Sequence, residues 1–227
     1  MVLLRSPDVG FLLFSGLYNI ELAMMNYLLI AILLMLQLVP VLSIFCVPKT
    51  VYATCNMEPT SGNSIRGTVA FRQRVGWLCW PIGSLEIMVE LTGLPTDTGT
   101  IAHGFHIHEY GDLSEGCTSA GSHYNPFSRN HGGRFSRVRH IGDLGNVFQD
   151  KNGNINTAFS AYLPALTGPL SVLGRAVVIH EKPDDLGRGM NAESKKTGNA
   201  GSRLGCCIID RSNGDRWDGE WDGDSDP

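Results

Sequence analysis

The fold is decided by the stretch Leu85-Glu86-Ile87-Met88-Val89-Glu90-Leu91, in which apolar and more polar side chains alternate. In an extended chain, successive side chains point to opposite faces, so the odd-numbered residues of this stretch share one apolar face. Glu86 and Glu90 share the other face. A period of two is typical of a half-buried antiparallel strand and not of a helix.

Similar short strands are expected on both sides of this stretch, with turn residues between them. Thr92-Gly93 and Thr167-Gly168-Pro169 are two such turn signals. No stretch of adequate length has helical periodicity with caps. The pattern predicts an all-β sandwich or Greek-key barrel, interrupted by two long loops that are usually functional, near residues 111–146 and 181–203. The further strands are expected at residues 67–72, 104–109, 176–180 and 205–209.

The composition indicates one domain of ordinary size with appendages. The chain has 227 residues, of which 43% are hydrophobic and 18% charged, and its net charge is -4. So low a charge fraction argues against a disordered chain, and the acidic balance argues against a nucleic-acid partner. The acidity is concentrated in residues 210–227, which hold seven acidic and two basic residues. We expect a domain at 54–209 and a disordered acidic tail at 210–227.

Residues 1–53 contain a long apolar segment. No charged residue occurs between residues 22 and 48, and the 20 residues 28–47 are interrupted only by Gln37, Pro40 and Ser43. Such a run is typical of a secretory signal that is removed, of an uncleaved membrane anchor or, less often, of a buried soluble helix. Both membrane interpretations send the rest of the chain through the secretory route. We therefore predict a secreted, extracellular protein, with a membrane-anchored form as the alternative.

The cysteines gain meaning from this route, because disulfides persist in its oxidising compartment. Cys46 lies in the apolar segment and would be lost with a cleaved signal. Cys79, between Trp77 and Trp80, is expected to be a buried free thiol in an apolar strand. An odd set remains without Cys46, which predicts at least one unpaired thiol or an intermolecular link. The set is Cys55, Cys79, Cys117, Cys206 and Cys207.

Six of the seven histidines fall within the two long loops or at their edges. His106 and His108 are one residue apart on an expected strand, so their rings share a face and could chelate one ion. An isolated pair of this kind is more often ordinary surface, but a cluster of histidines with a carboxylate is costly without a compensating ion. Three imidazoles with one carboxylate suit zinc, whereas a site made mainly of imidazoles suits copper. His103 lacks this support and is expected to be structural or at the surface. The other cluster members are His123, His131, His140, Asp143 and His180.

Eight short sequence blocks follow one another between residues 104 and 204. They are 104–112 (GFHIHEYGD), 116–121 (GCTSAG), 123–126 (HYNP), 131–133 (HGG), 140–146 (HIGDLGN), 174–182 (GRAVVIHEK), 184–187 (DDLG) and 197–204 (TGNAGSRL). Together they resemble the copper/zinc superoxide dismutases over about residues 54–209, and so many blocks in order are far more specific than a lone motif. The adjacent Cys206 and Cys207, Cys55 and Gly168-Pro169-Leu170 are most similar to the secreted members.

The resemblance implies a flattened eight-stranded Greek-key β-barrel or sandwich with two long functional loops, holding one copper and one zinc ion per subunit. His123 would bridge the two ions, and Asp184 would orient ligands of both sites. Arg203 would attract and anchor the substrate anion beside copper. The implied copper ligands are His106, His108, His123 and His180. The implied zinc ligands are His123, His131, His140 and Asp143.

The activity that the resemblance implies is dismutation of superoxide to dioxygen and hydrogen peroxide by alternate reduction and oxidation of the copper. It also implies a homodimer and a disulfide between Cys117 and Cys206. A second disulfide between Cys55 and Cys207 is a weaker expectation, taken from the extracellular members. Heparin binding by the tail is not expected, because the tail is acidic. The alternative is a metal-binding or copper-handling protein on the same fold without turnover.

Overall fold

The computed structural model describes residues 24–34, 47–58, 62 and 64–217, and the chain divides into the units Met1–Cys46 and Val47–Pro227. In the first unit, residues 24–34 form a helix with exposed side chains. Among the described residues, no helix has the length and apolar character needed to cross a membrane. Most of the predicted signal or anchor, residues 1–23 and 35–46, lies outside the described residues.

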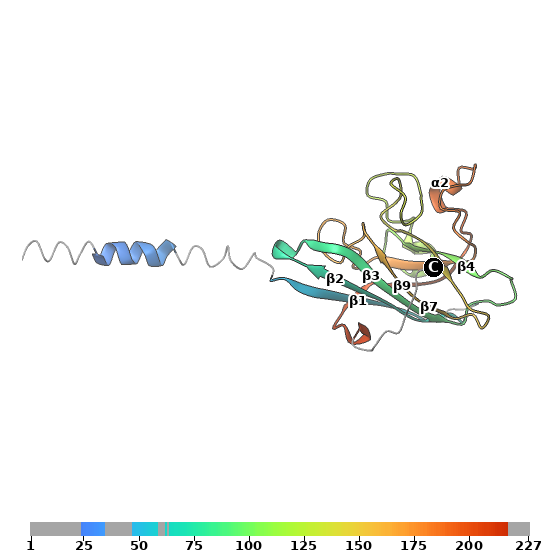
Figure 1. Ribbon diagram of the computed structural model, residues 1–227, viewed down its shortest axis with the longest axis horizontal. Coiled ribbons are helices and arrows are strands. Elements are labelled where there is room, and N and C mark those ends of the chain that lie inside the picture. Colours follow the sequence, from blue (N-terminus) through green and yellow to red (C-terminus); the bar gives the residue numbers. More distant parts are fainter. Residues whose placement is uncertain (1–23, 35–46, 59–61, 63, 218–227) are drawn as a thin grey trace, which may run out of the picture. The chain divides into compact units, whose positions relative to one another are not determined.

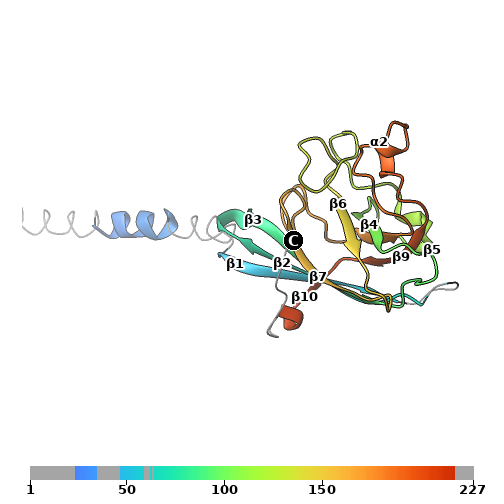
Figure 2. The same cartoon turned by 45° about the vertical axis from the view of Figure 1, so that its right-hand side comes forward.

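The second unit is built from two antiparallel sheets of five and four strands, which confirms the predicted all-β class (Figures 1 and 2). The first sheet has the order β10 (Asp210–Ser212), β1 (Lys49–Met57), β2 (Arg66–Val75), β3 (Pro81–Thr92) and β7 (Ile155–Ala161). The second has the order β6 (Asp143–Phe148), β4 (Ala102–Ile107), β8 (Ala176–His180) and β9 (Arg203–Ile208). Short elements complete the unit: β5 (Ser114–Cys117), α2 (Ser194–Thr197) and the 3-10 turns Trp77–Cys79, Thr118–Ala120 and Asp215–Trp217.

The alternation in β3 places one row of side chains between the sheets. Leu85, Ile87 and Leu91 are fully or almost fully buried, while Glu86 and Glu90 are partly exposed. Phe105 from β4 meets Phe159 from β7 edge to face, with ring centres 6.5 Å apart, so the two sheets touch through aromatic side chains. Burial of apolar side chains on both inner faces is the main source of stability in such a sandwich.

Strand β10 is a departure from the expected eight strands and from the expected disorder of residues 210–227. Asp210 to Ser212 pair with β1, with Tyr52 opposite Ser212 and Thr54 opposite Asp210. The 3-10 turn that follows places Trp217 beside Arg72 of β2, whose guanidinium lies 4.3 Å from the ring centre. Edge pairing and this cation–π contact hold the start of the tail. Residues 218–227 lie outside the described residues.

Strand β1 is the second departure. It begins at Lys49, before the predicted domain start at residue 54, and pairs with β2 along its whole length. Residues 49–53 therefore belong to the β unit and not to the apolar segment predicted at residues 1–53. Pairing with β2, the next strand along the chain, decides the structure of these residues.

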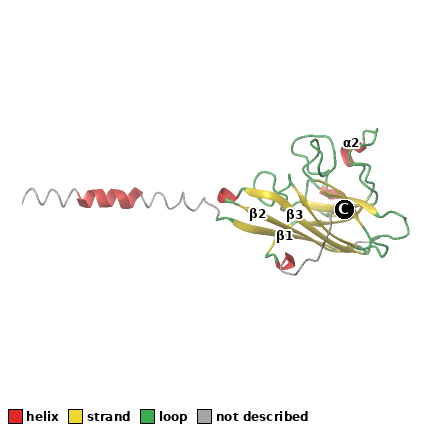
Figure 3. Ribbon diagram, viewed as in Figure 1, coloured by secondary structure: helices red, strands yellow, loops and turns green. Residues whose placement is uncertain are grey.

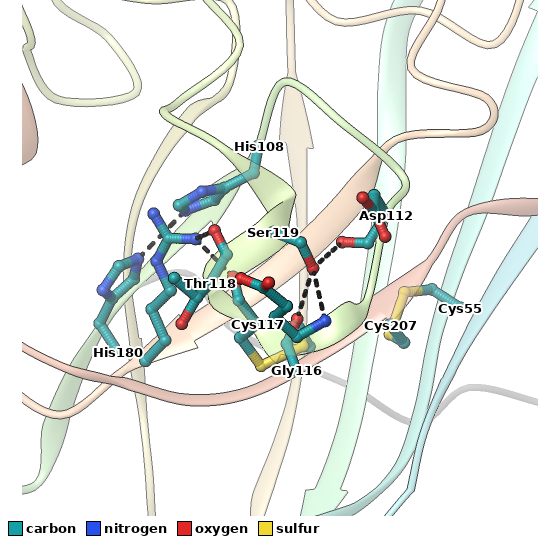
Figure 4. The surroundings of a disulfide bond; sticks show 12 residues. Cys55, His108, Asp112, Gly116, Cys117, Thr118, Ser119, His180 and Cys207 are labelled. Carbon is teal, nitrogen blue, oxygen red and sulfur yellow. Dashed lines mark hydrogen bonds between the residues drawn. A yellow bond between two sulfur atoms is a disulfide. The ribbon is translucent and has the colours of Figure 1, made fainter.

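Two disulfides fasten the loops and sheets to β9. Cys117 pairs with Cys206 and Cys55 pairs with Cys207, across 89 and 152 residues of sequence (Figure 4). Successive residues of a strand point to opposite faces, so the adjacent Cys206 and Cys207 reach different partners. Cys207 joins β9 to β1 in the opposite sheet, and Cys206 joins β9 to the loop after β4.

Cys79 is neither buried nor free, contrary to the sequence-based expectation. It is exposed at the turn between β2 and β3, and it is disulfide-bonded. No cysteine in the described part of the chain is a free thiol. The flanking tryptophans suggested an apolar strand, but they too are exposed at this turn.

The long loops 108–142 and 181–202 gather on one side of the second sheet, around the short helix α2 (Figures 2 and 3). The loop after β4 is held by the Cys117–Cys206 bond, and the loop after β8 leads directly into β9. Both loops therefore meet over the end of β4, where His106 and His108 lie.

Replacing both Cys55 and Cys207 by Ala is expected to lower the free energy of unfolding by about 2–5 kcal/mol, because the cross-link restricts a very long loop in the unfolded chain. The measurement is urea unfolding of the metal-free protein, so that bound metal does not mask the loss. Ser114→Ala, at an exposed position in β5, is the control that should leave the midpoint in place. An unchanged midpoint in the double variant would contradict a stabilising role for this disulfide.

Candidate metal centre

Strand alternation in β4 points two imidazoles away from the core. Phe105 and Ile107 are fully buried between the sheets, so His106 and His108 face the long loops, as the sequence predicts. His180 is the last residue of β8, the neighbour of β4. The loop after β4 brings His123 back against His108, where the two residues form an isolated β-bridge.

The first ligand set consists of four buried imidazoles. One ring nitrogen from each can be chosen so that all four lie within 4.8 Å of one another. The ring centres of His106 and His123 are 3.9 Å apart, and Nε2 of His108 lies 3.3 Å from Nε2 of His180. The set contains His106, His108, His123 and His180.

The second ligand set is organised around the Asp143 carboxylate at the start of β6. Its Oδ1 lies 3.0 Å from Nδ1 of His123, 2.9 Å from Nδ1 of His131 and 3.1 Å from Nδ1 of His140. Its Oδ2 accepts hydrogen bonds from the backbone N–H groups of His140 and Gly132. Both oxygens are thus fixed, and the three rings converge on one point.

Hydrogen bonds on the outer side of the rings decide which nitrogen is free. Nδ1–H of His108 donates to the backbone oxygen of Gly121, and Nδ1–H of His180 donates to that of Gly201, at 3.0 and 3.3 Å. A neutral imidazole carries one proton, so Nε2 of each ring presents a lone pair to the other. Two lone pairs 3.3 Å apart repel unless a cation lies against them.

Three further ring nitrogens have a free lone pair that could bind a metal. Nδ1 of His106, Nε2 of His123 and Nδ1 of His131 are buried without a hydrogen-bond partner. Buried polar atoms are normally satisfied, so each of these calls for an explanation. Nδ1 of His131 lies near Asp143 but outside hydrogen-bond geometry, which is how two ligands of one ion approach each other. The donor set therefore fits imidazole-binding metals at two adjacent positions.

Asp184 links the two ligand sets from behind. Its Oδ2 accepts from Nε2–H of His106 at 3.0 Å, and its Oδ1 accepts from Nε2–H of His131 at 2.7 Å. These bonds leave the Nδ1 atom of each ring free to bind metal. A Cβ on Gly198 would lie 1.8 Å from Oδ1 of Asp184, so the backbone can approach the carboxylate only at a glycine.

Asn146 is a supporting residue whose role no sequence pattern predicts. Its side-chain amide donates to the backbone oxygen of Asp184 at 2.9 Å and accepts from the backbone N–H of Asp184 at 2.7 Å. This pair of bonds fixes the backbone that carries the linking carboxylate. No spacing rule identifies such a contact, because the two residues are 38 positions apart.

Burial controls the protonation of the rings. Burial, followed by the neighbouring His123, lowers the pKa of both His106 and His108 well below the ordinary value. The same causes lower the pKa of His180 to about 4. These rings are therefore neutral near pH 7, as a metal ligand must be.

At the second ligand set, the contacts of the Asp143 carboxylate oppose the effect of burial on the pKa values. Burial alone lowers the pKa of His131, but the adjacent Asp143 carboxylate and the hydrogen bond with Asp184 outweigh it and raise the pKa to about 9. Burial also disfavours the charged form of the Asp143 carboxylate, yet its contacts with the three imidazole rings hold the pKa of Asp143 far below its usual range. Asp143 is thus an anion in a buried site, which favours a cation there.

His103 belongs to neither ligand set. It is buried, its Nδ1–H donates to the backbone oxygen of His180 at 2.8 Å, and its Nε2 lies 3.0 Å from Oε1 of Gln149. Of the two expectations for this residue, structural or surface, the structural one is correct. The contact also fixes the backbone of His180, a member of the first set.

Arg203 stands opposite His180 in the pairing of β8 with β9. Its guanidinium donates to the backbone oxygens of Cys117, Thr118 and Gly121, with the last bond at 2.5 Å. These carbonyls belong to the loop that the Cys117–Cys206 disulfide holds against β9 (Figure 4). The arginine is thus half-buried at a fixed position beside the first ligand set.

An open pocket of about 780 Å³ leads from the surface to the rings. Arg203 lines it together with His108, His123 and His180, so the first ligand set is accessible from solvent. Its other charged lining residues are Arg129, Glu193, Lys195 and Lys196. Basic groups outnumber acidic ones around the opening, which favours entry of a small anion.

Comparison with known proteins agrees with this geometry. The sequence pattern described as copper/zinc superoxide dismutase (SODC) matches residues 65–209. The chain belongs to the copper/zinc superoxide dismutase family. Three relatives from different sources share this similarity.

The superoxide dismutase [Cu-Zn] of Paramecium bursaria Chlorella virus 1 is 47% identical over 145 residues, which cover 64% of this chain and 72% of the relative. The extracellular superoxide dismutase [Cu-Zn] of Onchocerca volvulus is 40% identical over 195 residues, which cover 82% of this chain and 97% of the relative. The extracellular enzyme of Drosophila melanogaster is 44% identical over 150 residues, covering 66% and 78%. Similarity to extracellular superoxide dismutases thus extends over most of the chain.

Asp184→Asn is expected to weaken zinc binding about 10- to 100-fold, because one of the two carboxylate oxygens becomes an NH2 group that cannot accept a hydrogen bond from its ring. The measurement is zinc competition with a chromogenic chelator, with folding checked by circular dichroism. Asp185→Asn is the matched control, since the Asp185 carboxylate accepts from Ser194 and Asn199 and not from the rings. Equal zinc affinity in Asp184→Asn and the unaltered protein would show that Asp184 does not position the ligands.

Proposed function

We propose that the two ligand sets of this superoxide dismutase hold one copper and one zinc ion, which share His123. The support is the position of His123, whose Nε2 belongs to the first set and whose Nδ1 faces Asp143 in the second. Loss of both ring protons is plausible only between two cations. The proposed copper ligands are His106, His108, His123 and His180. The proposed zinc ligands are His123, His131, His140 and Asp143.

The enzyme dismutates superoxide, and its cofactors are copper and zinc. When bound, copper supplies one-electron redox chemistry and zinc supplies charge without redox change, so that two superoxide ions and two protons give one dioxygen and one hydrogen peroxide. The chain's own residues have to admit the anion, keep it near the first set and supply protons. The pocket and the residues around it serve these three needs.

Arg203 is the proposed anchor for superoxide. Its charge does not titrate in the physiological range, and its bonds to three loop carbonyls hold the guanidinium at the pocket wall beside His180. Lys195 and Lys196 add positive charge at the opening, and Glu193 offsets part of it. The anion is thus attracted from solvent and stopped next to the first ligand set.

His123 is the proposed proton carrier. Its Nε2 is buried without a hydrogen-bond partner on the side of the first set, while Nδ1 is held 3.0 Å from Asp143. The ring can therefore take up and release a proton at Nε2 without changing its orientation. His123 also lines the pocket, so the proton has a short route to a bound anion.

A metal-binding or copper-handling protein without turnover is the less favoured function. Such a protein needs accessible ligands but has no need for a fixed cation beside them. Arg203 is held by three loop carbonyls and stands at the pocket wall, an arrangement that serves substrate binding. The relatives described above are also named as enzymes.

Secretion is the proposed localisation. Two disulfides in the β unit and the extracellular relatives support an oxidising compartment. The apolar run at residues 28–47 supports entry into the secretory route, with a membrane-anchored form as the alternative. Homodimer formation and the lack of heparin binding by the acidic tail remain predictions from the sequence.

Arg203→Gln is expected to lower the bimolecular rate constant at least about tenfold while copper stays bound, because the fixed cation at the pocket wall is removed. Arg203→Lys keeps the charge but loses the hydrogen bonds to the three loop carbonyls. Its rate constant should therefore lie between those of Arg203→Gln and the unaltered protein. The measurement is pulse radiolysis with copper quantified in the same sample. Arg211→Gln, an exposed arginine in β10, is the control. An unchanged rate in Arg203→Gln would remove Arg203 from the mechanism.

Raising the ionic strength is expected to slow turnover, because salt screens the attraction between the anion and the basic pocket with a Debye length of about 10 Å at 0.1 M. This enzyme class is a known example of such electrostatic steering. Rate constants measured across a salt series should fall steadily in the unaltered protein and less steeply in Arg203→Gln. Salt-independent turnover would contradict steering by this pocket.

A further inference from the structure

The turn between β2 and β3 exposes an apolar tip. Trp77 and Trp80 are 65% and 57% exposed, and Leu78 and Ile82 are 53% and 52% exposed. No charged residue occurs between Arg74 and Glu86. We call Trp77, Leu78, Trp80 and Ile82 the hairpin tip. Four large, exposed apolar side chains within six residues of one turn indicate an interaction site.

The backbone of the hairpin tip is fixed and not a loose loop. Leu78 and Cys79 have positive φ angles of 63° and 58°, which are uncommon for residues other than glycine. A backbone bond from Gly76 N–H to the Trp80 oxygen closes the turn at 2.9 Å, and the Thr167 hydroxyl donates to the Cys79 oxygen at 2.7 Å. The apolar side chains therefore stand exposed on a rigid base.

Two basic residues flank the hairpin tip. Lys49, the first residue of β1, pairs with Val75, and Arg74 pairs with Thr50 on one side and Ile82 on the other. Both Lys49 and Arg74 are exposed. Tryptophan beside lysine and arginine is the residue combination found at the boundary between lipid headgroups and hydrocarbon.

The chain enters the β unit next to the hairpin tip. The uncharged run of residues 22–48 ends directly before Lys49, and Lys49 lies opposite Val75 at the base of the turn. The run is long enough to span a bilayer as a helix. The point where the chain enters the β unit and the hairpin tip therefore lie at the same end of the β unit. The metal pocket is lined by the loops after β4 and β8 and does not use the hairpin tip.

We propose that the hairpin tip docks onto a lipid bilayer, with Trp77, Leu78, Trp80 and Ile82 in the interfacial layer and Lys49 and Arg74 against anionic headgroups. The surface is independent of the metal site and would keep the enzyme at the membrane face. It requires no change in the fold, since the side chains are already exposed on a rigid turn.

Quenching by brominated lipid tests the proposal on the full chain, because the apolar run alone could attach the chain to vesicles. The four tryptophans are Trp77, Trp80, Trp217 and Trp221. In the variant W217F/W221F, tryptophan fluorescence comes only from the hairpin tip. In the variant W77F/W80F, it comes only from Trp217 and Trp221. Both are bound to vesicles of phosphatidylcholine and phosphatidylserine, with phosphatidylcholine brominated near the headgroup end of its acyl chains.

Fluorescence of the tip-reporting variant should fall at least about twofold on brominated vesicles relative to unbrominated ones, while that of the tail-reporting variant changes little. Adding L78N and I82N to the tip-reporting variant should abolish the difference, whereas adding F127N, at an exposed position in another loop, should not. Superoxide dismutation should be equal in L78N/I82N and the unaltered chain.

Two results would overturn the proposal. One is equal quenching in the tip-reporting and tail-reporting variants, and the other is the absence of quenching in the tip-reporting variant while the chain is attached to vesicles. Lipid-free self-association that disappears in L78N/I82N, without quenching at the tip, would also overturn it and assign the surface to a second copy of the chain.

Discussion

The structure of the site depends on two buried carboxylates. Asp143 faces three imidazoles at 2.9–3.1 Å, and Asp184 accepts hydrogen bonds from His106 and His131. Each ring that Asp184 fixes has its other nitrogen free and buried. Without a cation these anions and lone pairs would be costly to bury, so the arrangement makes physical sense only as a site for metals. His131 contacts both carboxylates and thereby couples the two ligand sets.

Strand β9 connects this site to the rest of the fold. Cys206 fixes the loop after β4, Cys207 fixes the opposite sheet, and Arg203 fastens three carbonyls of the same loop. One short strand therefore determines the pocket wall, the loop position and the contact between the sheets. A rigid wall matters because a cation can guide an anion only if it is already in place when the anion arrives.

Local patterns predict much of this protein, and long-range pairing explains the remainder. The alternation in β3 predicts its buried face, and the spacing of His106 and His108 predicts their shared direction, because both depend only on the period of a strand. Strand β10 and the contact of Trp217 with Arg72 depend on a partner far along the chain, so an acidic composition suggested disorder instead. The roles of Asn146 and of the carbonyls around Arg203 are equally non-local. The prediction of a buried free thiol at Cys79 is wrong, because a sequence does not distinguish exposed tryptophans from buried ones.

The most direct test of the account is superoxide dismutation by the purified protein, with copper and zinc quantified in the same sample. The account predicts turnover in proportion to bound copper, with one copper and one zinc per chain at saturation. Full loading with both metals and no turnover would contradict it, because the same residues would then bind metal without catalysing the reaction.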